Sequence, residues 1–219
     1  MKKALIITAF LAGMMYFIMS CGDKPSAPDG TKTALMRGWS DFDEEAYQDA
    51  IEAFKDALAQ DTDNNTALCG LGWSYCRLDS FETGIGYFEQ SLEDYPDDHC
   101  SLTGISFAWA AVDSHALAAD PLSRVLAATD SAVIISETFS ITVDEMRSLL
   151  STAYFLQNKA GKLSVQVEEI SPGHGIVPDD AASWKVGDDE MNSYEDALLF
   201  EVLEYASGAA LPKQQYAKK

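Results

Sequence analysis

Basic side chains are scarce in this sequence. It has 15 Lys and Arg residues against 35 Asp and Glu residues, so its formal net charge is −20 at pH 7. A surface with this charge repels nucleic acid and anionic lipid headgroups, and it favours basic or neutral partners. The simplest explanation for the charge is a solvated surface that like charges keep soluble.

The residue patterns that usually indicate catalysis or metal binding are missing as well. The three histidines are far apart, with no HxxxH pair, and the four cysteines form neither a CxxC motif nor a Cys/His cluster for zinc. No glycine-rich phosphate motif is present, and Gly72–Cys76 lacks the second glycine of a nucleophile elbow. We therefore expect a protein that is not an enzyme and binds no metal or cofactor.

The segment Met1–Cys21 resembles a bacterial lipoprotein signal. Lys2 and Lys3 precede the apolar run Ala4–Met19, which Ser20 and Cys21 end abruptly. This run is short for the alternative, a spanning helix, which needs about 20 apolar residues to cross the hydrocarbon layer. The resemblance implies a cleaved signal peptide at 1–20 and an acylated Cys21, carrying for example palmitate. The segment 21–33 contains two prolines, two glycines and no large apolar residue, which predicts a flexible tether.

The stretch Asn65–Asp98 places particular residues at fixed positions. Counted from Asn65 as position 1, the informative positions 7, 8, 11, 24 and 32 hold Leu71, Gly72, Tyr75, Phe88 and Pro96. This pattern resembles a tetratricopeptide repeat, a 34-residue helix–turn–helix unit. The resemblance implies an all-α, right-handed superhelical solenoid in which stacked units share a continuous core.

Similar units lie on both sides of this stretch. The preceding unit, about Thr31–Asn64, has Phe54 at position 24, and the following unit starts at His99 in the same phase. Pro121 falls within the second helix of that third unit, so we expect the helix to begin late, near Asp120, or to kink.

The repeat phase is lost at Ile134–Ile141, which we predict to be an inserted loop. A capping box at Thr142–Glu145 then starts a fourth, degenerate unit. Its second half, Leu163–Ile170, is a short helix or, because apolar and polar residues alternate there, a strand. A long loop, Ser171–Asp189, precedes an amphipathic final helix at Ser193–Ser207.

The repeat phase bears on the cysteines. Cys69 and Cys76 lie two turns apart on one helix, too far for a disulfide. Cys100 is close in phase to Cys69, so these two could pair in an oxidising periplasm. Because the cysteines do not show the regular spacing of a disulfide-stabilised scaffold, we favour three separately buried thiols and keep the Cys69–Cys100 disulfide as the alternative.

The resemblance also implies which side chains face a ligand. In this family the first helix of each unit lines the concave face, and position 9 of three successive units holds Trp39, Trp73 and Phe107. The candidate groove residues are Trp39, Phe42, Trp73, Arg77 and Phe107. We expect the final helix to lie in or beside the groove and bury these rings, rather than to leave the groove open.

Together these features predict a lipid-anchored solenoid of three to four repeats with a C-terminal capping helix. The repeats span 34–172, and the segment 173–219 forms a loop, the capping helix and a tail. We expect a partner protein or peptide of the cell envelope as ligand, and an outer membrane location facing the periplasm. The alternative is a glycan or small-solute capture lipoprotein beside an outer-membrane importer, which would stack sugars on the aromatic residues.

Overall fold

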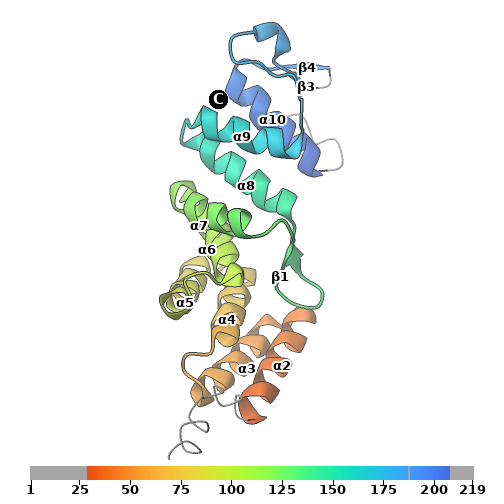
Figure 1. Cartoon of the computed structure of the whole chain (residues 1–219). Coiled ribbons are helices and arrows are strands. Elements are labelled where there is room, and N and C mark those ends of the chain that lie inside the picture. The colour runs from red at the N-terminus through yellow and green to blue at the C-terminus, as the bar shows by residue number, and fades with distance from the viewer. Residues whose placement is uncertain (1–28, 187, 208–219) are drawn as a thin grey trace, which may run out of the picture.

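The computed structural model describes residues 29–186 and 188–207, which form a stack of helical hairpins (Figure 1). Within these ranges the paired helices are α2 (Asp29–Asp43) with α3 (Tyr47–Gln60), α4 (Asn65–Arg77) with α5 (Phe81–Asp94), α6 (His99–Ala111) with α7 (His115–Ala128), and α8 (Val143–Leu156) with α9 (Ala160–Ile170). A last helix, α10 (Tyr194–Ser207), packs on α8 and α9. No helix of these ranges is long and apolar enough to cross a membrane.

The turn between the two helices of each pair has a left-handed backbone conformation. The residues with positive φ in these turns are Glu45, Asp79, Asp113 and Asn158. Asp and Asn tolerate this conformation better than most residues other than glycine. The first three recur at the repeat spacing, whereas Asn158 comes later than that spacing requires. The chain therefore carries an insertion between the third and fourth hairpins.

Side-chain caps fix where three of the first helices begin. Asn64 accepts a hydrogen bond from the backbone N–H of Ala67 (3.0 Å) at the start of α4, and Asp98 accepts one from Ser101 (2.7 Å) at the start of α6. The capping box predicted before α8 is present, since Thr142 and Glu145 bond to each other's backbone N–H. Each cap satisfies N–H groups that have no partner within the helix.

The core between neighbouring hairpins is built from phenylalanines inserted against glycines. Phe54 lies between Gly38 and Gly70, and a Cβ atom on either glycine would come within 2.6 Å of its ring. Phe88 is held in the same way between Gly72 and Gly104, one repeat further along. A glycine is therefore needed where each first helix crosses the ring, and the repeat spacing reproduces this packing.

The inserted segment is a β-hairpin and not an irregular loop. Strand β1 (Val133–Ile134) pairs with β2 (Ser140–Ile141) in antiparallel register. Val133, Ile135 and Ile141 are buried, so the segment predicted to be a loop contributes to the core. The hairpin extends from the α7–α8 connection back towards the end of α2 (Figure 1).

Two further helices begin earlier than residue 34 and Asp120, where the sequence placed their starts. The tether was expected to extend to residue 33, but α2 already begins at Asp29, because Thr31 and Ala34 are buried. Helix α7 begins at His115 and continues through Pro121. The proline leaves the carbonyl group of Leu117 without its helical donor, and Leu117 lies on the exposed side, where water can replace that donor.

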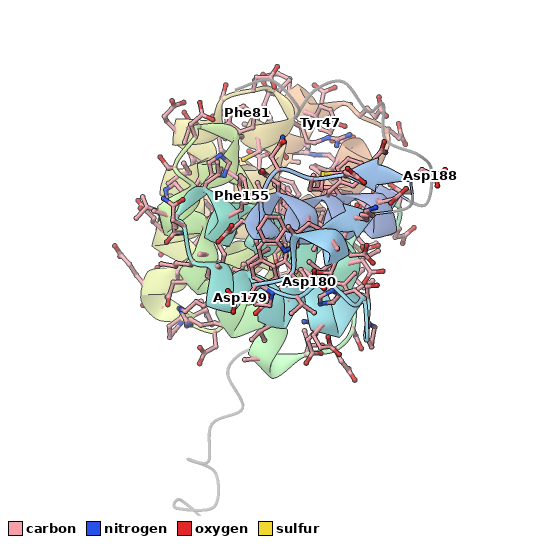
Figure 2. The ribbon with its side chains drawn as sticks, turned by 90° about the horizontal axis from the view of Figure 1, so that it is seen from above. Tyr47, Phe81, Phe155, Asp179, Asp180 and Asp188 are labelled. Carbon is pink, nitrogen blue, oxygen red and sulfur yellow. A yellow bond between two sulfur atoms is a disulfide. The ribbon has the colours of Figure 1, made fainter. Side chains whose placement is uncertain are left out.

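Residues 163–170 are helical, because their buried positions follow a helical spacing. Leu163, Val167 and Ile170 are buried at i, i+4 and i+7, whereas Val165, which suggested a strand, is exposed. The segment after α9 contains a 3₁₀ turn (Ala181–Ser183) and a short hairpin of β3 (Lys185–Val186) and β4 (Asp189–Glu190). The exposed acids of this segment, Asp179, Asp180 and Asp188, lie at the end of the stack that faces the viewer in Figure 2.

Candidate functional site

Helices α2, α4 and α6 lie side by side and form one face of the stack, which we call the first-helix face. All five groove residues predicted from the sequence lie on these helices. The three aromatic residues at position 9 do not stack on one another. Trp39 packs edge-on against Phe54 with their ring centroids 5.0 Å apart, and Trp73 packs edge-on against Phe88 at 5.8 Å. Each indole therefore contacts the core of its own helix pair.

The β-hairpin covers the middle of the first-helix face. The Phe139 ring lies 5.2 Å from the ring of Trp73 and 6.2 Å from that of Phe42. As a result Trp73 is only 5% exposed and Phe42 only 4%. We expected α10 to bury these rings, and that prediction is wrong: α10 packs on α8 and α9, at the far end of the stack from α2. Trp73 and Phe42 are buried by the β-hairpin instead, whereas Trp39 and Phe107 are half-buried.

Arg77 connects the β-hairpin to the first two helix pairs. Its Nε donates a hydrogen bond to the hydroxyl of Tyr47 (2.9 Å), and its guanidinium lies over the rings of Tyr47 (5.2 Å) and Phe139 (5.6 Å). Such cation–π contacts contribute about 0.5–1 kcal/mol at exposed sites. The side chain is held in place while part of it stays accessible.

Asp43, at the end of α2, binds the tip of the hairpin. Its carboxylate accepts hydrogen bonds from the hydroxyls of Ser136 and Thr138, the second at 2.7 Å, and from the backbone N–H of Thr138 at 3.3 Å. Burial acts to raise the pKa of Asp43, but these hydrogen bonds to the charged form outweigh it and lower the pKa below 3.8. The ionised carboxylate therefore favours the docked hairpin.

An apolar pocket of about 340 Å³ lies beside the hairpin on the same face. Phe81 and Phe107 form two of its walls, and Phe139 and Ile141 of the hairpin form another. Trp73 and Arg77 line it as well. This pocket brings together three of the five predicted groove residues, whereas Trp39 and Phe42 do not line it.

Trp73, one of the lining residues, also has a buried hydrogen-bond donor without a partner within the described ranges. The indole Nε1–H of Trp73 is buried and has no acceptor among the described residues. A buried donor without a partner costs about 1–3 kcal/mol.

Comparison with solved structures identifies the architecture. YrrB, described as a TPR protein with an unusual peptide-binding site, matches with a TM-score of 0.57 at 17% identity over 84% of this chain and 93% of YrrB. The first TPR of Spaghetti (RPAP3), bound to an HSP90 peptide, matches with a TM-score of 0.51 at 14% identity over 63% of this chain and 99% of that one. The chain has the tetratricopeptide-repeat fold.

A third similar structure is PilW, described as a type IV pilus biogenesis factor, with a TM-score of 0.54 at 20% identity over 81% of this chain and 76% of PilW. No family model matches the sequence. No curated protein matches it either. The fold expected from Asn65–Asp98 is therefore confirmed by structural similarity alone.

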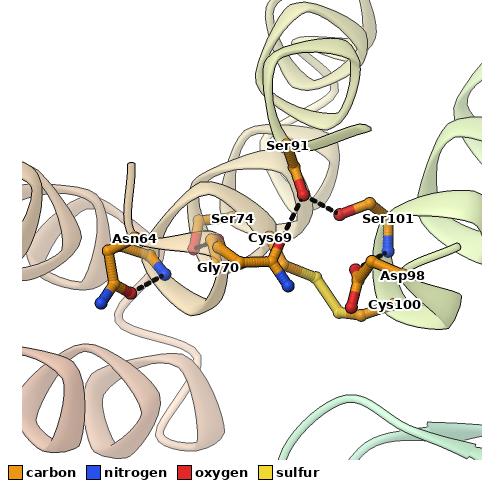
Figure 3. The surroundings of a disulfide bond; sticks show 10 residues. Asn64, Cys69, Gly70, Ser74, Ser91, Asp98, Cys100 and Ser101 are labelled. Carbon is orange, nitrogen blue, oxygen red and sulfur yellow. Dashed lines mark hydrogen bonds between the residues drawn. A yellow bond between two sulfur atoms is a disulfide. The ribbon is translucent and has the colours of Figure 1, made fainter. Parts of the chain in front are cut away.

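A disulfide joins two neighbouring repeats of the tetratricopeptide fold. The bond connects Cys69 of α4 to Cys100 of α6, as Figure 3 shows, so we correct our preference for three separate thiols. The side chain of Ser91 on α5 bonds to Asn65 and to the hydroxyl of Ser101 (2.8 Å) close to this link. The position of Cys100 early in α6 brings it opposite Cys69, as the repeat phase suggested.

The remaining thiol and the nearby carboxylate do not form a reactive site. Asp98 lies within 4.8 Å of the sulfurs of Cys69 and Cys100, but both sulfurs belong to the disulfide and are not thiolate ligands. Cys76 is a free thiol at the pocket, and burial raises its pKa to about 12, so it is protonated at neutral pH.

Sequence reasoning missed four contributors to the site: Asp43, Tyr47, Phe81 and Phe139. The first three lie at or near the turns inside the repeats, outside the positions that the repeat pattern marks as groove residues. Phe139 lies in the insertion, for which the repeat gives no register. The one sequence signal for Phe139 was a large aromatic ring within a β-branched, hydroxyl-rich segment.

Proposed function

We propose that this protein binds an extended segment of a partner protein on the first-helix face, without catalysis, and that a lipid on Cys21 anchors it in the cell envelope. The observation that carries the proposal is the apolar pocket beside Phe139 on the first-helix face. The similar structures include one described as having a peptide-binding site and one with a bound peptide, which supports this class of ligand.

The pocket determines which part of a partner would enter it. Its walls come from Phe81, Phe107 and Phe139, so a large apolar side chain is the matching group. Burying such a side chain contributes about 1.5–3 kcal/mol. The net charge of −20 disfavours strongly acidic segments and favours neutral or basic ones.

Selected peptides test this function. Random peptides displayed on phage would be selected on the full chain in detergent, and their affinity measured by fluorescence polarisation. Ala111 lines the pocket and is exposed, so Ala111→Trp should fill the pocket and weaken binding at least tenfold. Ala127 is exposed on α7, and Ala127→Trp is the matched control. Peptides that bind both variants equally would show that the pocket is not the site.

The lipid anchor rests on the sequence, since Cys21 lies outside the described residues. We expect the wild-type chain, produced in a Gram-negative host, to incorporate an alkyne-labelled palmitate and to fractionate with the membranes. The Cys21→Ala variant should lose both properties. Further separation of inner and outer membranes would test the proposed outer membrane location, and equal labelling of the two proteins would refute the anchor.

Glycan capture, the alternative function, receives no support from the covered aromatic residues. Stacking a sugar requires an accessible ring face, but Trp73 is 5% exposed and Trp39 packs against Phe54. Tryptophan emission should therefore remain constant when maltoheptaose or chitohexaose is added. A saturable change would revive this alternative.

A further inference from the structure

The tip of the β-hairpin occupies part of the face that we propose to bind a partner. Phe139 contacts Trp73, Phe42 and Arg77, three of the groove residues expected from the repeat pattern to contact a ligand. The hairpin lies in the insertion that separates the third and fourth helical hairpins beyond the regular repeat spacing. Residues 136–139 form the turn of this β-hairpin, which the hydrogen bond from the Ser136 N–H to the Phe139 carbonyl (2.9 Å) closes. The first-helix face thus already holds a turn of its own chain.

The chemistry of these contacts does not require that the segment belong to the same chain. An aromatic ring lies against Trp73 and under the Arg77 guanidinium, while the preceding residue, Thr138, donates to Asp43 through its hydroxyl and its backbone N–H. Any segment that adopts this turn and has a Ser or Thr followed by an aromatic residue can offer the same groups.

The tip is held less firmly than the base of the hairpin. At the base, Val133, Ile135 and Ile141 are buried, whereas at the tip Glu137 and Thr138 are exposed and Phe139 is only half-buried. Each strand pairs through two residues only, which is too short for independent stability. A competing segment therefore needs to displace one aromatic side chain and the hydrogen bonds to Asp43, while the base stays in place.

We propose that residues 136–139 are an internal ligand, and that the partner displaces them with a segment carrying a hydroxyl residue followed by an aromatic residue. This inference rests on the proposed function and deepens it, because it names the partner's chemistry and adds a second subsite next to the open pocket. The internal segment competes at an effective concentration in the millimolar range for a short connection. The apparent affinity of the partner equals its intrinsic affinity multiplied by the fraction of molecules in which the tip is undocked.

The test uses the chain's own hexapeptide SETFSI, residues 136–141, labelled with fluorescein, and the full chain in detergent. The Phe139→Ala variant should bind this peptide at least tenfold more tightly than the wild type, because the internal competitor is weakened. The control peptide SETASI should bind at least tenfold more weakly than SETFSI. Equal affinity of wild type and variant, or of the two peptides, would overturn the proposal.

A cross-linked variant tests displacement without removing the aromatic ring. Asp43→Cys with Thr138→Cys, in a Cys76→Ala background, would lock the tip to α2, since the Asp43 carboxylate and the Thr138 hydroxyl are 2.7 Å apart. The locked protein should bind the library-selected peptides more weakly than the same variant after reduction, because both forms lack the Asp43 carboxylate and only the reduced form can release the tip. The Cys76→Ala protein treated in the same way controls for reduction of the native disulfide.

The outcomes separate this inference from the function on which it rests. If the locked protein binds the selected peptides normally and Ala111→Trp still blocks them, the groove function holds and displacement of the tip is wrong. If no selected peptide depends on the pocket, the proposed function itself fails. A concentration-dependent dimer that Phe139→Ala abolishes, seen by analytical ultracentrifugation, would assign the tip to a second copy and overturn its role as an internal ligand.

Discussion

Removing the Cys69–Cys100 disulfide should destabilise the second repeat strongly. The two cysteines are 31 residues apart, and the loop they close contains the whole of α5. In the chain-entropy model, a loop of this length restricts the unfolded state by about 3.5–4 kcal/mol at 25 °C. Cys69 is also 1% exposed, so its replacement by alanine adds the loss of a buried sulfur.

The double variant Cys69→Ala, Cys100→Ala should therefore unfold at a temperature lower by about 7–15 °C, using about 2–4 °C per kcal/mol for a domain of this size. Thermal unfolding followed by circular dichroism measures this shift. Hydrogen exchange should localise the effect, because repeat units are stabilised mainly by their neighbours. Amides of α5 should exchange much faster, whereas those of α9 should change little.

Reductant provides the control for this experiment. Wild-type protein in a phosphine reductant should approach the stability of the double variant, and the variant itself should not respond to the reductant. An unfolding temperature that changes by less than about 2 °C in both cases would show that the link does not restrict the unfolded chain as argued. Equal exchange rates in α5 would lead to the same conclusion.

Close contacts and protonation states support three further predictions. Gly104→Ala should lower the free energy of unfolding, measured in urea, by about 1–3 kcal/mol, because its Cβ would lie 2.2 Å from the Phe88 ring. Gly86→Ala, which has no atom near its added Cβ, should raise the free energy of unfolding by up to about 1 kcal/mol. The opposite order of stability would contradict the packing argument. Cys76, with its pKa raised to about 12, should react with iodoacetamide at pH 8 far more slowly in the native protein than in urea, and equal rates would refute its burial. Because its pKa is lowered, the ionised Asp43 carboxylate stabilises the docked β-hairpin above pH 3.8, and this stabilisation is lost as the pH falls through the lowered pKa. Acid should therefore undock the tip and change tryptophan emission in the wild type but not in Asp43→Asn. The same acid transition in both proteins would show that this carboxylate is not responsible.

The sequence predicted the helical repeats well because their positions are set by packing that recurs once in every repeat. Phe54 and Phe88 need glycines at fixed distances along the chain, so the pattern is visible without a structure. The same phase placed Cys100 opposite Cys69, although phase alone does not decide whether two nearby thiols are oxidised. Local signals such as the capping box at Thr142 also located a helix start correctly.

The site was less predictable because its central contact joins residues that are almost a hundred positions apart. The tip of the hairpin meets Asp43 at separations of 93 and 95 residues, and no periodicity relates an insertion to the repeat it covers. We expected an amphipathic helix to bury the aromatic rings, because α10 had an apolar side to cover. That side instead packs on α8 and α9, the hairpin of helices immediately before it. Only the three-dimensional path of residues 129–142 reveals what lies over Trp73.

The attachment of the internal ligand to its own binding face has a quantitative consequence for how much partner is needed to fill that face. Occupancy of the face by Phe139 does not depend on how much of the protein the cell makes, because the two are parts of one chain. The concentration of a matching partner that fills half of the faces is therefore raised by one fixed factor, whatever the amount of this protein. The hairpin would thus keep the face largely closed to background levels of weakly matching segments, whereas a local enrichment of the correct one would fill it.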